Sequence, residues 1–186
     1  MTLAERIVAV HEALERAGIP HAIGGAIALA YWTLDPRGTG DIDVNVFVPN
    51  SDPAAALAAL PPGVDQPDGT TDAVIRDGQV RLWWDETPVD LFFSNVPLHE
   101  RAAEAARTVP FEGIELPVLG PTELAIFKAM FDRTRDWADI EAMLAAETLD
   151  VEAVRMGLTE MVGDDDPRLA RLADSVSRAV PPGSEM

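Results

Sequence analysis

Two aspartates separated by one residue, Asp41 and Asp43, are the first candidates for chemistry in this sequence. They stand in the run DIDVNVFV, where Ile42 and Val44 alternate with them. This period of two predicts a β-strand over 41–48, with both carboxylates on one face and the apolar residues on the other. Adjacent carboxylates repel each other unless a cation lies between them, and Mg²⁺ accepts such oxygen ligands together with substrate phosphates. An isolated D-x-D is more often a pair of solvated acids, so a metal site needs support from other residues.

A third acid, Asp90, stands between apolar residues in the run VDLFF, which also predicts a strand. A carboxylate in such a place is unfavourable if it is buried without a partner. Asp90 is therefore predicted either to complete a metal site or to be the base that takes a proton from an acceptor. The alternative is an exposed residue on an edge strand, without a role.

Residues that suit phosphate binding stand on the N-terminal side of the aspartate pair. Gly24 and Gly25 open a short apolar helix, and glycines at a helix N-terminus let the backbone approach a phosphate closely. Arg37 and Thr39 come just before Asp41 and offer a cation and a hydroxyl to phosphate oxygens. Each of these features alone is also compatible with an ordinary turn or loop.

Lysine usage gives independent support, because the chain has thirteen arginines but a single lysine, Lys128. A compact ammonium group is a common point-charge partner of phosphate, whereas arginine binds through a planar fork. We predict a phosphate-binding role for this residue. It lies in a predicted helix, followed by the charged residues Arg133, Arg135, Asp136 and Asp139.

The combination of G-G, a helix, R-x-T-x-D-x-D on a strand and a separate acid on another strand resembles the nucleotidyltransferase superfamily, which includes polymerase beta and the aminoglycoside nucleotidyltransferases. The resemblance covers about residues 19–95. It implies that Gly24 and Gly25 hold an NTP and that Asp41, Asp43 and Asp90 bind the metal, Mg²⁺ or Mn²⁺. One departure is Gly25, which stands where many members have serine, and Thr39 is the residue expected to compensate.

The C-terminal half looks similar to the AbiEii-type toxin nucleotidyltransferases of bacterial and mycobacterial toxin–antitoxin systems. The similarity rests on K-x4-R from Lys128 to Arg133, followed by R-D-x-x-D. It implies that Lys128 contacts nucleotide phosphates and that Asp136 or Asp139 is required for activity, without a choice between them. It also implies transfer to the 3′ end of tRNA, which blocks translation, and a cognate antitoxin as partner.

Composition limits the alternatives. A chain of 186 residues with a formal net charge of −18 suits one acidic globular domain and disfavours non-specific nucleic-acid binding. The absence of cysteine excludes a disulfide framework and a thiolate metal site. We find no membrane-spanning run and no signal-peptide pattern, so we expect a cytoplasmic protein.

The elements expected around these residues give an α+β fold, with a mixed-sheet nucleotidyltransferase core, flanking helices and a C-terminal helical bundle. The core is expected over 1–119, the helical subdomain over 120–180 and a flexible tail over 181–186. Antiparallel strands are expected over 72–95, with a hairpin turn at Asp77-Gly78, which is a common two-residue turn pair. Helices are expected over 2–17, 26–32, 54–60, 98–107 and in several segments after Pro121.

Several residues are not assigned a role. His11, His21 and His99 are expected to be surface or capping residues, since none has a second ligand at metal spacing. Trp83 and Trp84 should point to opposite faces of a strand, one buried and one exposed, with base stacking as a minor possibility for the exposed ring.

The leading hypothesis is therefore a nucleotidyltransferase toxin that moves a nucleoside monophosphate from an NTP such as ATP or CTP to tRNA. One alternative is transfer to a small molecule such as an aminoglycoside, which the acidic charge favours because a polycation is attracted to it. Another is a binding module with the same fold and no turnover. The sequence leaves the oligomeric state, the preferred NTP and the antitoxin mechanism open.

Overall fold

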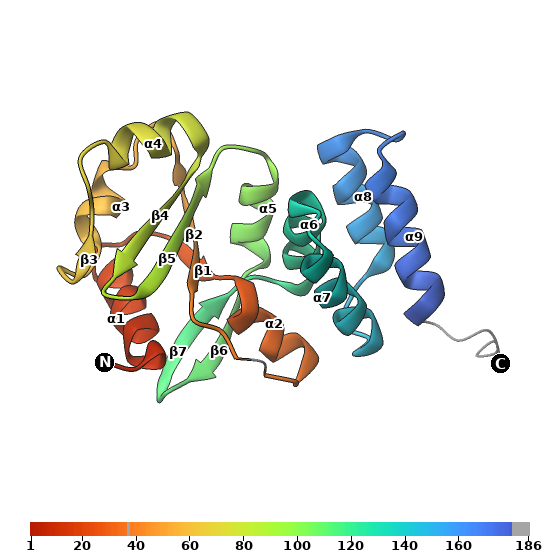
Figure 1. Ribbon diagram of the computed structural model, residues 1–186, viewed down its shortest axis with the longest axis horizontal. Coiled ribbons are helices and arrows are strands. Elements are labelled where there is room, and N and C mark those ends of the chain that lie inside the picture. Colours follow the sequence, from red (N-terminus) through yellow and green to blue (C-terminus); the bar gives the residue numbers. More distant parts are fainter. Residues whose placement is uncertain (37, 180–186) are drawn as a thin grey trace. The chain divides into compact units, whose positions relative to one another are not determined.

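The computed structural model describes residues 1–36 and 38–179, and its strands form one mixed sheet of seven strands (Figure 1). The predicted phosphate ligand Arg37 and the predicted tail 181–186 lie outside the described residues. The strands are β1 (His21–Ile23), β2 (Ile42–Pro49), β3 (Val64–Asp65), β4 (Gln79–Trp84), β5 (Thr87–Ser94), β6 (Arg107–Phe111) and β7 (Ile114–Val118).

The strand order across the sheet is β3-β4-β5-β2-β1-β7-β6. β2 pairs in parallel with β5, as does β1 with β7, while the other neighbouring pairs are antiparallel. Mixed pairing combined with separate helices confirms the predicted α+β class. The central position of β2 matters for function, because this strand carries the D-x-D motif into the middle of the sheet.

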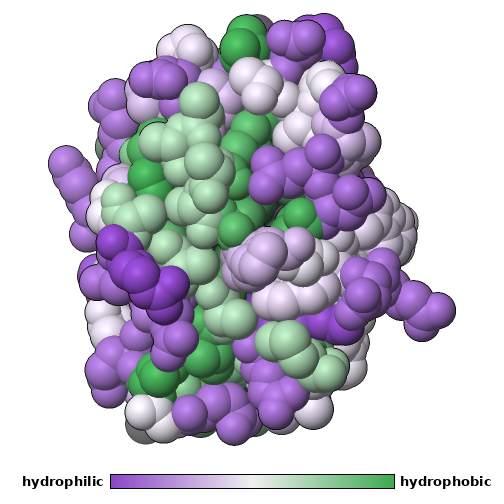
Figure 2. All heavy atoms as spheres, turned by 90° about the vertical axis from the view of Figure 1, so that its left-hand side faces the viewer, coloured by the Kyte–Doolittle hydropathy of each residue, from purple (hydrophilic) through white to green (hydrophobic). Residues whose placement is uncertain are grey.

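The described chain divides into two compact units. The first unit contains residues 1–27 and 38–119, with the whole sheet and the helices α1 (Leu3–Arg16), α3 (Ala54–Ala59), α4 (Thr70–Asp77) and α5 (Leu98–Ala105). Helix α2 (Gly25–Thr33) begins in this unit and continues into the second. On the side of this unit where α1, α3 and β3 lie, hydrophilic side chains border a band of apolar ones (Figure 2).

The second unit contains residues 28–36 and 120–179, with the helices α6 (Pro121–Phe131), α7 (Thr134–Ala145), α8 (Val151–Val162) and α9 (Pro167–Ala179). Helix α6 packs against α7 and α8, and α9 packs against the same two helices. The core of this second unit is apolar and includes Trp137, Ile140, Met143, Leu158 and Leu172. Among the described residues, none of the helices combines the length and apolar character that a membrane span requires.

The hairpin expected at Asp77-Gly78 is wrong. Residues 70–77 form helix α4, and Gly78 caps its C-terminus in the left-handed region with φ 70°. Because an Asp-Gly pair suits both a hairpin turn and a left-handed helix cap, the dipeptide alone could not separate them. The chain reverses instead between β4 and β5, where Asp85 has φ 53°.

The expectation of surface or capping histidines is also wrong, since His11, His21 and His99 are each less than 9% exposed. His21 Nδ1 lies 2.7 Å from the carbonyl oxygen of Ile19, which only accepts, so this nitrogen is the donor. His21 Nε2 is 2.9 Å from His11 Nδ1, so a neutral His21 accepts there and His11 donates. The two rings thus join α1 to β1.

We expect acid to destabilise the fold through this pair. Burial lowers the pKa of His21, so the unfolded chain, with a histidine pKa of about 6.5, takes up the proton first as the pH falls. The free energy of unfolding therefore decreases below about pH 6.5 and keeps decreasing until the pH passes the folded-state pKa. In thermal unfolding, the decrease in Tm between pH 8 and pH 5 should be smaller for His21→Gln than for the wild type. Some decrease should persist in this variant, because burial also lowers the pKa of His99. Equal decreases in both proteins would contradict this assignment.

Candidate active site

The D-x-D motif lies at the start of β2 with the alternation that the sequence predicts. Ile42 and Val44 are fully buried, whereas Asp41 and Asp43 are partly exposed on the opposite face. Because successive side chains of a strand point to opposite faces, the buried pair fixes the direction of the two carboxylates. The apolar residues of β2 thereby hold both acids on one side of the sheet.

Asp90 joins this pair through strand register. It lies on β5 directly beside Asp43 in the parallel β2–β5 ladder, so the two side chains share a face. Asp41, Asp43 and Asp90 each offer a carboxylate oxygen, and these three oxygens lie within 4.8 Å of one another. We call these three residues the acidic triad.

The acidic triad fits a divalent metal site. Mg²⁺ binds oxygens at about 2.0–2.1 Å, so two oxygens on opposite sides of one ion are about 4.2 Å apart. Two ions about 3.5–4 Å apart also bridge oxygens at such separations. The predicted ligand set is thus brought together with a spacing that small side-chain rotations can adapt to one ion or two.

The glycine pair lies against the acidic triad. The Gly24 amide donates to the Asp43 carbonyl oxygen at 2.8 Å, which fixes the loop to β2. Gly25 has φ +53°, and a Cβ atom there would lie 1.8 Å from Asp43 Oδ2. A side chain at position 25 therefore requires Asp43 to move, in addition to straining the backbone. Both features favour glycine at this position, where the superfamily resemblance implies serine.

Thr39 lies beside Asp41 of the acidic triad. Its hydroxyl donates to Asp41 Oδ1, and the Asp41 amide lies 3.5 Å from the same hydroxyl. The threonine therefore orients an acid of the triad, and its expected contact with phosphate stays a prediction from the sequence.

Arg81 is a site residue that sequence reasoning missed. It lies opposite Asp90 in the antiparallel β4–β5 ladder, and its guanidinium donates to both carboxylate oxygens, Nε to Oδ1 at 2.7 Å and Nη2 to Oδ2 at 2.6 Å. Asp90 thus has a cationic partner before any metal is considered. A correct β4–β5 register predicts this pair, but the hairpin expected at 77–78 concealed that register.

Lys128, Asp136 and Asp139 form a buried charged group in the second unit. The Lys128 ammonium donates to Asp139 Oδ2 at 2.6 Å and lies 4.0 Å from Asp136 Oδ1. Asp136 accepts instead from the backbone and the guanidinium of Arg133. All three residues of the group are less than 10% exposed, and the close ion pairs that compensate their charges are Lys128 with Asp139 and Arg133 with Asp136.

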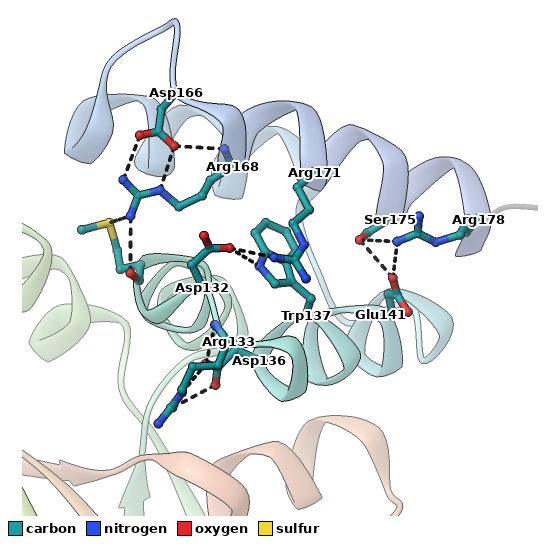
Figure 3. A network of polar contacts seen from close by, with 11 residues as sticks. Asp132, Arg133, Asp136, Trp137, Glu141, Asp166, Arg168, Arg171, Ser175 and Arg178 are labelled. Atoms are coloured by element: carbon teal, nitrogen blue, oxygen red, sulfur yellow. Dashed lines mark hydrogen bonds and ion pairs between the residues drawn. The ribbon is translucent and has the colours of Figure 1, made fainter.

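Arginines on the helices of the second unit are mostly paired with acids (Figure 3). Arg171 binds Asp132, whose carboxylate also accepts from the Trp137 indole. The other pairs join Arg133 to Asp136, Arg155 to Glu152, Arg168 to Asp166 and Arg178 to Glu141. Five of the arginines on these helices are thus partly neutralised by acids of the same unit.

Comparisons with known proteins support this assignment at the level of the fold. The chain matches no protein-family model and no curated protein. It resembles the solution structure of the antibiotic-resistance factor ANT(2″)-Ia, with a TM-score of 0.60 and 12% identity over 92% of this chain and 95% of that one. The crystal structure of ANT(2″)-Ia in complex with adenylyl-2″-tobramycin has a TM-score of 0.52 and 13% identity, over 97% of this chain and 100% of that one. The crystal structure of a nucleotidyltransferase-like protein from Paracoccidioides brasiliensis has a TM-score of 0.45 and 16% identity, over 92% of this chain and 93% of that one.

These structural neighbours are nucleotidyltransferases, and the chain has their fold, as the motifs around Asp41 predict. At 12–13% identity the similarity extends to the fold alone. The AbiEii-type subgroup stays a prediction from the sequence.

Proposed function

We propose that the chain is a metal-dependent nucleotidyltransferase that transfers a nucleoside monophosphate from an NTP to a hydroxyl of a small cationic acceptor. The observation that carries the proposal is the acidic triad, three carboxylates within 4.8 Å on one face of the sheet. The glycine pair supports it, because it brings the N-terminus of α2 against Asp43, and a helix N-terminus favours a bound phosphate.

In this proposal Asp41 and Asp43 hold the metal, and Asp90 either completes the metal site or accepts the proton of the acceptor hydroxyl. A bound Mg²⁺ or Mn²⁺ would neutralise phosphate charge and align the attacking and leaving oxygens. The acceptor oxygen forms a bond to the α-phosphorus while the bond from that phosphorus to the bridging oxygen of the β-phosphate breaks. Pyrophosphate leaves with the electron pair of that bond, and the hydroxyl proton passes to a base.

Charge favours a cationic acceptor over RNA. The chain carries a formal net charge of −18, which repels a phosphate backbone and attracts a polycation. The paired arginines of the second unit further reduce the positive charge available to tRNA. Transfer to the 3′ end of tRNA, an antitoxin partner and a cytoplasmic location stay predictions from the sequence.

Trp83 is the residue that we assign to acceptor binding. Its ring is 47% exposed, while the neighbouring Trp84 is buried, as the strand alternation predicts. Trp83 is two residues from Arg81 on β4, so it lies on the same face as the acidic triad, about 7 Å along the strand. It also pairs across the sheet with the exposed Asp65. A tryptophan face beside a carboxylate suits a protonated amine.

Replacing Trp83 with alanine is expected to raise the KM for the acceptor about threefold to tenfold, since a cation–π contact contributes about 0.5–2 kcal/mol. The affinity for Mn²⁺ should not change. Steady-state kinetics with a saturating NTP measures the effect. Ile75→Ala, which removes another exposed apolar side chain of the same unit, is the matched control and should leave KM unchanged. Equal KM values for the Trp83 variant and the wild type would show that Trp83 does not bind the acceptor.

The function itself is tested by incubating the protein and Mg²⁺ with each α-labelled NTP, first with a set of aminoglycosides and then with total tRNA. Label on an aminoglycoside supports the proposal, and label on tRNA alone supports the toxin hypothesis instead. A protein that binds Mn²⁺ and NTP but labels neither acceptor would match the alternative of a binding module without turnover.

A further inference from the structure

Arg81 and Asp90 form a two-point ion pair at the position where the proposed function places the third metal ligand or the base. Both oxygens of Asp90 accept from one guanidinium, at 2.7 and 2.6 Å. The Asp90 side chain is 13% exposed and that of Arg81 is 53% exposed. The arginine thus approaches the acid from the solvent side and occupies the oxygens that a metal ion would use.

Strand register places the pair in line with the rest of the triad. Asp43 lies beside Asp90 on β2, and Arg81 lies opposite Asp90 on β4, so the three residues form one row across three strands. The pKa of Arg81 is raised, mainly by its hydrogen bonds to Asp90 and further by the charges of Asp41 and Asp43. The guanidinium therefore interacts electrostatically with all three acids of the triad.

A purely structural role explains this pair less well. Exposed ion pairs contribute about 0–1 kcal/mol to stability, and the β4–β5 hairpin is already joined by a backbone ladder from Gln79 to Trp84. Three carboxylates within 4.8 Å, in contrast, repel one another strongly when no divalent ion is bound. A cation at Asp90 relieves this repulsion.

We propose that Arg81 is a built-in counter-ion that offsets one of the three negative charges of the acidic triad in the metal-free protein and competes electrostatically with the divalent metal ion for Asp90. A metal ion that binds Asp90 shares the carboxylate with the guanidinium, and the positive charge of the guanidinium opposes the approach of the metal ion. Arg81 therefore weakens metal binding to the free protein and holds Asp90 in place until the metal arrives. The inference rests on the metal site of the proposed function.

The test is a titration of the nucleotide-free protein with Mn²⁺, in which electron paramagnetic resonance measures the free ion. Arg81→Gln removes the competing charge and should lower the Kd for Mn²⁺ by about tenfold. Arg76→Gln is the matched control, because Arg76 makes the same two-point pair with Asp77 on α4 away from the triad. It should leave the Kd unchanged.

Arg81→Lys keeps the charge but loses the two-point contact, so its Kd should lie between those of the wild type and Arg81→Gln. If circular dichroism shows that Arg81→Gln does not fold, the test is the comparison of the Kd of Arg81→Lys with that of the wild type. An unchanged or higher Kd in the Arg81 variants, with Mn²⁺ binding to the wild type, overturns the inference and leaves the proposed function standing. No Mn²⁺ binding by the wild type or any variant overturns both.

Discussion

Replacing Asp43 with asparagine is expected to lower the rate of nucleotidyl transfer by about 10³-fold. The physical reason is that a bound metal stabilises the transition state by several kcal/mol, and each 1.36 kcal/mol corresponds to a factor of about ten. Asp43 is the centre of the site, since it lies beside Asp90 across the ladder and against Gly25. Asparagine keeps the shape of the side chain and removes its charge. The measurement is the rate of label transfer under single-turnover conditions.

The matched control is Asp52→Asn, which removes the charge of an exposed aspartate beyond the far end of β2. This variant should keep the wild-type rate and the wild-type Kd for Mn²⁺. The Asp43 variant should also bind Mn²⁺ at least about tenfold more weakly, because one carboxylate ligand is lost. An Asp43 variant that retains more than a tenth of the wild-type rate would show that the acidic triad is not the catalytic centre.

Local patterns predicted the parts of the site that depend on one segment. The alternation over DIDVNVFV predicted β2 and the face of Asp41 and Asp43, because two buried residues fix the direction of their neighbours. The glycine pair was predicted to start a helix near the acids, and Gly25 does begin α2 against Asp43. Periodicity carries this information within a single strand or helix.

Contacts between segments were predicted less well, because they depend on register. The two-point pair of Arg81 with Asp90 needs the β4–β5 register, which the wrong turn at Asp77-Gly78 displaced. The His11–His21 pair joins a helix to a strand, and no local pattern in the sequence marks such a contact. Polar residues that are satisfied by distant partners therefore look exposed when the sequence is considered one segment at a time.

Lys128, the single lysine of the chain, was predicted to bind phosphate but lies in a buried ion pair with Asp139. Replacing Lys128 with methionine is expected to lower the free energy of unfolding by about 3–5 kcal/mol. The reason is that Asp139 then keeps a buried charge without its partner at 2.6 Å. Thermal unfolding should show a decrease in Tm of roughly 10 °C for a chain of this size. Arg155→Met, which removes a cation from an exposed pair with Glu152, is the control and should change Tm little.

The double variant Lys128→Met with Asp139→Leu separates stability from function. Replacing a buried ion pair by apolar residues of similar size is often neutral or stabilising, so the double variant should regain most of the lost Tm. If Lys128 contacts nucleotide phosphates, or if Asp139 is required for activity, label transfer should stay at least about tenfold below the wild type in the refolded double variant. Recovery of both Tm and transfer would assign Lys128 to stability alone. An unchanged Tm in the single variant would contradict the buried pair itself. The two readouts together therefore decide whether the Lys128–Asp139 pair acts in nucleotidyl transfer or only stabilises the helical unit.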